Sequence, residues 1–138
     1  MRIILTILLF LVVKLSYGFD VSNSGYFAIV HKDGHVTKKI FRVSKKNNKW
    51  SLEDKKRDGT WQDVTCEQDC ILSVSTNQDI ERFMGGKPPK GITAECIHNS
   101  AFAFCSLSKT GMKNRKYLLV ALVTKSPIPI KLKRLDGE

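Results

Sequence analysis

Four cysteines between residues 66 and 105 constrain the fold of this chain more than any other feature: Cys66, Cys70, Cys96 and Cys105. In an exported chain of this size, four cysteines predict two disulfides. Cys66 and Cys70 flank a three-residue turn, and a turn at residues 99–102 would set Cys96 opposite Cys105. We therefore expect the pairing Cys66–Cys70 with Cys96–Cys105. Crossed pairings would need strand contacts that the sequence does not reveal.

The spacing of these cysteines argues against other chemistry. Zinc sites and redox motifs use cysteine pairs with two intervening residues, and no pair in this chain has that spacing. No calcium loop, phosphate-binding loop or nucleophile elbow is present either. The sequence predicts no metal, no cofactor and no enzymatic activity.

Residues 1–18 have the pattern of an export signal. Arg2 precedes an apolar run over residues 3–13, and small residues at 16 and 18 suit cleavage after Gly18. Eleven apolar residues are too few for a span that needs about twenty, so we expect no stable membrane insertion. The predicted product, residues 19–138, is a single β-rich domain cross-linked by disulfides. We expect it in the periplasm or outside the cell.

Short strand-like runs separated by turn signals fill this domain. Residues 25–31 and 35–43 flank Asp33-Gly34, a strong hairpin signal. The second run carries Lys38, Lys39 and Arg42, so we place it at the sheet margin.

Two tryptophans mark the strands that follow. Trp50 and Trp61 lie on either side of one charged turn, and we expect both indoles to pack in one core.

A short helix interrupts the strand pattern. Thr76 and Asp79 form a capping-box pattern, apolar residues follow at helical spacing, and Gly85-Gly86 ends the segment. The apolar run at residues 117–123 predicts a central strand, and Pro129 confines residues 127–134 to an edge or a strand start. The predicted fold is mainly β, a small antiparallel sandwich or partly open barrel with one short helix.

Charge gives the leading functional hypothesis. The chain has 23 Lys and Arg against 13 Asp and Glu, which favours an anionic partner. Two loops, residues 87–91 and 109–116, concentrate basic residues at Lys87, Lys90, Lys113, Arg115 and Lys116. We expect a binding protein, such as an inhibitor or immunity protein, whose loops engage the acidic surface of an exported toxin or cell-wall hydrolase. Nucleic acid is not the expected partner, because a basic surface alone implies only general attraction to phosphate.

Two alternatives stay open. A partly open barrel could act as a lipocalin-like carrier of a small apolar ligand, with Trp50 and Trp61 lining its cavity. A secreted basic ribonuclease would instead need His31, His35 and His98 to converge for acid–base work on a phosphodiester.

Overall fold

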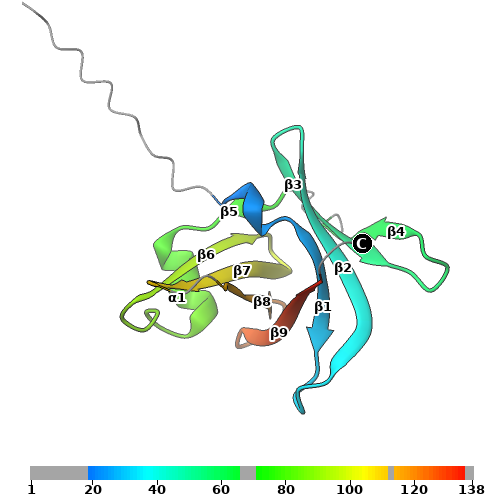
Figure 1. Cartoon of the computed structure of the whole chain (residues 1–138). Helices are drawn as coiled ribbons and strands as arrows, with labels where there is room; N and C mark the ends of the chain where they lie inside the picture. The colour runs from blue at the N-terminus through cyan, green and yellow to red at the C-terminus, as the bar shows by residue number, and fades with distance from the viewer. Residues whose placement is uncertain (1–18, 66–70, 112–113, 136–138) are drawn as a thin grey trace, which may run out of the picture.

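One antiparallel sheet of nine strands forms the body of the protein in this computed structural model (Figure 1). The structure describes residues 19–65, 71–111 and 114–135. The elements in chain order are η1 (Val21–Asn23), β1 (Gly25–Val30), β2 (Val36–Lys46), β3 (Lys49–Lys55), β4 (Trp61–Asp63), β5 (Ser73–Val74), α1 (Asn77–Met84), β6 (Ile92–His98), β7 (Phe102–Lys109), β8 (Lys116–Ala121) and β9 (Ile128–Leu135). The predicted mainly β fold with one short helix is confirmed.

The strands follow the order β4-β3-β2-β1-β9-β8-β7-β6-β5. Consecutive strands pair from β1 to β4 and from β5 to β9, with α1 between β5 and β6, whereas β4 and β5 lie at opposite ends of the sheet. The pairing of β1 with β9 joins these two sets, so the last strand completes the middle of the sheet. The sheet curls, and an isolated bridge between Trp50 and Leu72 links its two ends. The result is a partly open, curved sheet that is not closed into a barrel.

Local signals determine the hairpins and the helix. The β1–β2 turn contains Asp33-Gly34, and Gly34 has a φ of 93° that favours glycine. Asn47 and Asn48 join β2 to β3 with φ values of 51° and 60°, the left-handed conformation that asparagine tolerates. The predicted capping box of α1 is present, and Gly85 ends the helix in the left-handed conformation.

The concave face of the sheet carries the larger core. Phe27 pairs with Phe41 across β1 and β2, and Phe104 lies against both rings at centroid distances of 4.9 and 6.5 Å. Tyr117 stacks on Phe104 at 5.8 Å. These interlocked aromatic rings fill the curve of the sheet.

The convex face carries a second core beneath α1. Ile80 and Phe83 of the helix pack on the Cys96–Cys105 disulfide and on Val120. Cys96 and Cys105 are partners in the β6–β7 register, as the sequence predicted. This is the one disulfide of the described residues; Cys66 and Cys70 lie outside them, so their predicted bridge stays a prediction. The predicted export signal, residues 1–18, also lies outside them.

Two expectations about position need correction. β2 is not at the margin, because β1 and β3 pair with it on either side; Lys38 and Lys39 are exposed at an internal strand. Trp61 does not join Trp50 in one core: Trp50 is buried against Phe19, whereas Trp61 lies under the Arg42 guanidinium, 4.5 Å from the ring centroid. The two indoles lie on opposite faces of the sheet.

The tail strand β9 is internal, between β1 and β8, and of the two predicted places for its proline the strand start is the one observed. Pro129 is tolerated there because it sits at the strand start: it pairs with Val120 of β8, while β1 reaches only as far as Leu132. Within the described ranges, no helix is long and apolar enough to cross a membrane.

Candidate functional site

The two predicted basic loops meet at one end of the β6–β7 hairpin. Ile92 pairs with Lys109, and the Thr110 N–H donates to the Gly91 carbonyl at 3.2 Å. The loop with Lys87 and Lys90 therefore lies beside the loop that follows β7. Both of these lysines are exposed.

A row of lysines continues from these loops across the convex face. Cross-strand partners share a face of the sheet, so the register Cys105–Leu118–Lys131 places Lys131 on the same side as the disulfide and α1. Lys116 pairs with Leu107, and Lys133 pairs with Ala28 on this face. We call Lys109, Lys116, Lys131 and Lys133 the basic face; all four are exposed.

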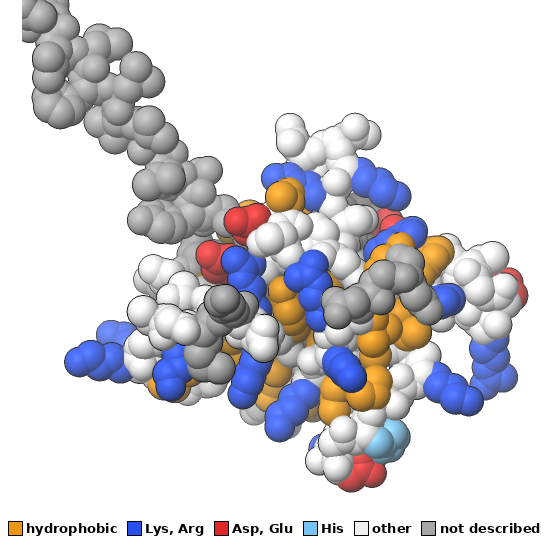
Figure 2. Space-filling model, viewed as in Figure 1, with side chains coloured by type: hydrophobic (Ala, Val, Ile, Leu, Met, Phe, Trp, Pro, Cys, Tyr) orange, Lys and Arg blue, Asp and Glu red, His pale blue; other side chains and the backbone are white. Residues whose placement is uncertain are grey.

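A shallow cavity of about 870 Å³ lies along this face. Its lining includes half-buried Leu107 and Leu118 beside Lys116, Lys131 and Lys133. Five of its twelve lining residues are basic and none is acidic. On the side of the molecule that Figure 2 shows, Lys and Arg side chains are spread among hydrophobic ones.

The loop residues predicted for partner binding do not all have the same role. Arg115 donates to the Ser22 hydroxyl at 2.8 Å and to the Asn23 Oδ1 at 2.7 Å, so it ties η1 to the start of β8. Lys116, its neighbour, points to the basic face. Lys113 lies outside the described residues.

A second cavity, of about 850 Å³, opens on the concave face. Its lining is largely apolar and comes from six strands and three loops: Ile29, Phe41, Leu52, Val64, Ala101, Phe102, Leu119, Ala121, Val123 and Ile130, with Lys39, Asp54, Thr65, Asn99 and Ser100. Lys39 and Asp54 bring opposite charges to it. Neither tryptophan lines this cavity, contrary to the expectation for a carrier.

Buried polar residues shape the wall of this cavity. The Thr65 hydroxyl accepts from the Leu52 N–H at 2.9 Å, and the Asn99 side-chain N–H donates to the Thr65 carbonyl at 3.3 Å. Asn99 Oδ1 also accepts from the backbone of Ala101 and Phe102, which shapes the β6–β7 turn at the rim. Sequence analysis missed this group, although Asn99 stands in a predicted turn where asparagine commonly bonds the backbone.

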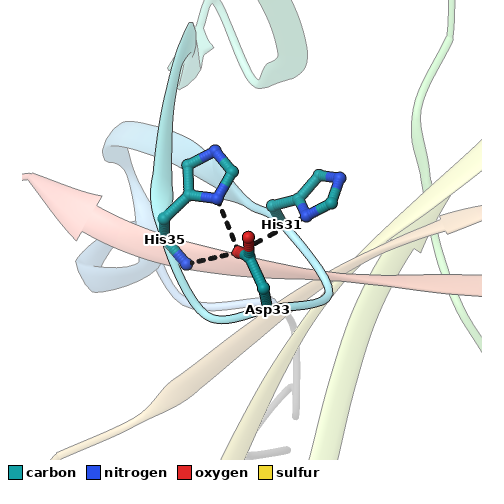
Figure 3. A group of neighbouring side chains, drawn as sticks. All are labelled: His31, Asp33 and His35. Atoms are coloured by element: carbon teal, nitrogen blue, oxygen red, sulfur yellow. Dashed lines mark hydrogen bonds and ion pairs between the residues drawn. The ribbon is translucent and has the colours of Figure 1, made fainter.

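The three histidines do not converge. His31 and His35 lie together at the exposed β1–β2 turn, with Asp33 between them (Figure 3). His98 lies on β6, where its Nδ1 is 2.7 Å from the Ser75 hydroxyl and its ring meets Phe83 edge to face. Three strands, β9, β8 and β7, separate β6 from β1 in the sheet.

Taken together, these residues describe a curled antiparallel sheet with an apolar cavity on one face and a lysine row on the other. The chain matches no protein-family model, no curated protein and no solved structure. The function proposed below therefore rests on the arrangement of its side chains alone.

Proposed function

We propose that this is an exported, non-enzymatic binding protein whose basic face engages an acidic surface of another protein. The proposal rests on three lysines of the basic face, Lys116, Lys131 and Lys133, which surround Leu107 and Leu118. The lining of this cavity contains no acidic residue. The Cys96–Cys105 disulfide fits an oxidising, exported location.

The chemistry of the row suits a protein partner. Half-buried leucines offer an apolar centre, and the surrounding lysines offer a charged rim, which is the usual anatomy of a protein–protein interface. A cluster of positive charges also speeds association with an acidic partner and makes the association rate sensitive to salt. Lys87 and Lys90, at the adjoining loop, extend the same charge. An inhibitor or immunity protein would use such a face on a toxin or hydrolase.

Affinity capture with a matched charge control tests this proposal. The oxidised domain, residues 19–138, is the bait, and Lys116→Glu/Lys131→Glu/Lys133→Glu reverses the basic face. The control Lys45→Glu/Lys46→Glu/Lys49→Glu makes the same charge change at the exposed β2–β3 hairpin. A captured exported protein is then purified, and its affinity for all three forms is measured by calorimetry.

Loss of affinity of at least tenfold in the basic-face variant, with less than threefold in the control, supports the proposal. Equal affinity of one partner for both variants contradicts it. Recovery of only nucleic acid or lipid that salt removes also contradicts it, because such material reports general charge attraction.

The concave cavity favours a second candidate function, carriage of a small apolar ligand. Its volume of about 850 Å³ lies in the range of small-molecule sites, and ten of its fifteen lining residues are apolar. A fluorescent anilinonaphthalene sulfonate dye is a suitable probe. Saturable binding that Leu119→Gln abolishes, and that Leu118→Gln on the opposite face leaves intact, would support a carrier; absence of binding would exclude it for this probe class.

A further inference from the structure

The turn between β1 and β2 gathers three metal-ligating side chains at an exposed tip of the molecule (Figure 3). Asp33 Oδ1 is 2.5 Å from His35 Nδ1 and 3.4 Å from His31 Nδ1. The two imidazole rings stack with their centroids 4.9 Å apart. One ligand atom from each of the three residues lies within 4.8 Å of the other two.

Backbone hydrogen bonds hold these side chains in place. The His31 N–H donates to the His35 carbonyl, and the Gly34 N–H donates to the His31 carbonyl, both at 2.9 Å. The His35 N–H also donates to Asp33 Oδ1 at 3.0 Å. Hydrogen bonds within the turn thus hold residues 31, 33 and 35 close together.

The spacing of these atoms suits a tetrahedral metal. With bonds of about 2.0 to 2.1 Å, two ligand atoms of a tetrahedral zinc ion lie about 3.3 Å apart. The distance between His31 Nδ1 and Asp33 Oδ1, 3.4 Å, is close to that value. His35 Nδ1, at 2.5 Å from Asp33 Oδ1, would move away from this oxygen by less than about 1 Å. Rotation of exposed side chains supplies such a movement.

We propose that His31, Asp33 and His35 bind one divalent transition-metal ion of the zinc type. Two imidazole nitrogens and one carboxylate oxygen form a ligand set typical of Zn²⁺ and Cu²⁺ and unlike the all-oxygen sets of Ca²⁺ and Mg²⁺. Three protein ligands leave a fourth position for water or for a group of another molecule.

The electrostatics of the turn favour a cation. Hydrogen bonds from the His35 backbone and then from the His35 side chain hold the pKa of Asp33 below its ordinary value. A carboxylate set between two imidazole rings gives a metal ion one anionic oxygen ligand and two nitrogen ligands. His31 directly follows Val30, which lines the cavity along the basic face, but the proposed metal site does not depend on the proposed partner.

Titration of the oxidised chain with zinc chloride in a non-chelating buffer tests the site. We expect one ion per chain by calorimetry, and shifts of the His31 and His35 imidazole signals, with those of His98 unmoved, by nuclear magnetic resonance. His31→Ala and His35→Ala should each weaken binding at least tenfold. His98→Ala is the matched control, because it removes an imidazole elsewhere and should leave the affinity within threefold.

Asp33→Asn separates a ligand role from a structural one. The amide oxygen can still accept from the His35 N–H, so the turn is kept while the charge is lost. We expect at least tenfold weaker binding in a folded variant. Absence of binding at millimolar zinc, displacement by an equal concentration of Mg²⁺, or unchanged affinity in His31→Ala and His35→Ala would overturn the proposal.

Discussion

At the scale of single residues, neighbours in the sequence take opposite roles. Arg115 and Lys116 read alike as members of one basic loop, but the Arg115 guanidinium bonds Ser22 and Asn23, more than ninety positions away. Asn23 is fully buried, and its Oδ1 also faces the Tyr117 hydroxyl at 3.5 Å. Arg115 therefore holds the first turn of the domain against β8, and Lys116 is left to the surface.

The first prediction separates these roles. Arg115→Ala should lower the free energy of unfolding by about 1 to 2 kcal/mol, because it removes two hydrogen bonds from a charged donor. Lys116→Ala should change it by less than about 0.5 kcal/mol, as for other exposed positions. Urea unfolding of both variants checks this, and equal stability of the two would contradict the structural role of Arg115.

At the scale of elements, short-range signals decide the local structure. The helix α1 begins at a capping box in which the Thr76 N–H donates to Asp79 Oδ2 at 3.0 Å and the Asp79 N–H donates to the Thr76 hydroxyl at 3.2 Å. The β6–β7 hairpin is joined by its disulfide as well as by its ladder. The capping box and the disulfide can each be removed by substitution without changing the other.

The second prediction concerns pH. Hydrogen bonds from the Thr76 backbone and then its side chain lower the pKa of Asp79. A lowered pKa in the folded state means that the carboxylate stabilises the fold above the unfolded-state pKa, near 4, and that this contribution is lost as the pH falls through the folded-state pKa. Asp79→Asn should thus be less stable than wild type by about 0.5 kcal/mol at pH 6, with the difference closing towards pH 2.

Urea unfolding at several pH values measures this difference. Glu81→Gln is the control, because it removes a carboxylate of the same helix outside the capping box. A difference between Asp79→Asn and wild type that stays constant from pH 6 to pH 2 would contradict the assignment.

The third prediction concerns the disulfide. Cys96 and Cys105 are nine positions apart, so their bridge closes a short loop. The Cys96→Ala/Cys105→Ala double variant should lose about 2 to 3 kcal/mol of unfolding free energy, yet keep the β-sheet signal in circular dichroism, because the hairpin ladder does not need the bridge. Loss of the folded signal at 25 °C would show that the bridge is required for folding.

At the scale of the whole molecule, the curvature of the sheet gives it a concave and a convex face, and each face carries one of the two cavities described above. The concave face is filled at its centre by aromatic rings and hollowed at one end, whereas the convex face is covered by α1 on one side and by lysines on the other. Figure 1 shows β1 and β9 side by side in the middle of this sheet. The pairing of β1 with β9 joins the beginning of the described chain to its end, so both faces depend on it.

The fourth prediction tests the centre of the concave core. Phe104 is fully buried and contacts the rings of Phe19, Phe27, Phe41 and Tyr117. Phe104→Ala should cost about 3 to 5 kcal/mol, a large share of the stability of a small domain. Val123→Ala, at a side chain that is 78% exposed, should stay within about 0.5 kcal/mol of wild type. Thermal or urea unfolding compares the two.

The sequence by itself determined the hairpins, the helix and the pairing of Cys96 with Cys105. Each rests on residues that lie within about ten positions of one another, such as Asp33-Gly34 or the Thr76 cap, so local conformational preference is enough to predict them.

Only the tertiary structure decided which strands are internal and which side chains share a face. Trp61 and Trp50 have similar local patterns, but the curl of the sheet buries one and leaves the other beneath Arg42. The register of consecutive hairpins brings the lysines of β7, β8 and β9 to one face, and β1 pairs with β9 across the length of the described chain. Such pairing is fixed by burial of the whole curved core, a long-range property that no short stretch of sequence contains.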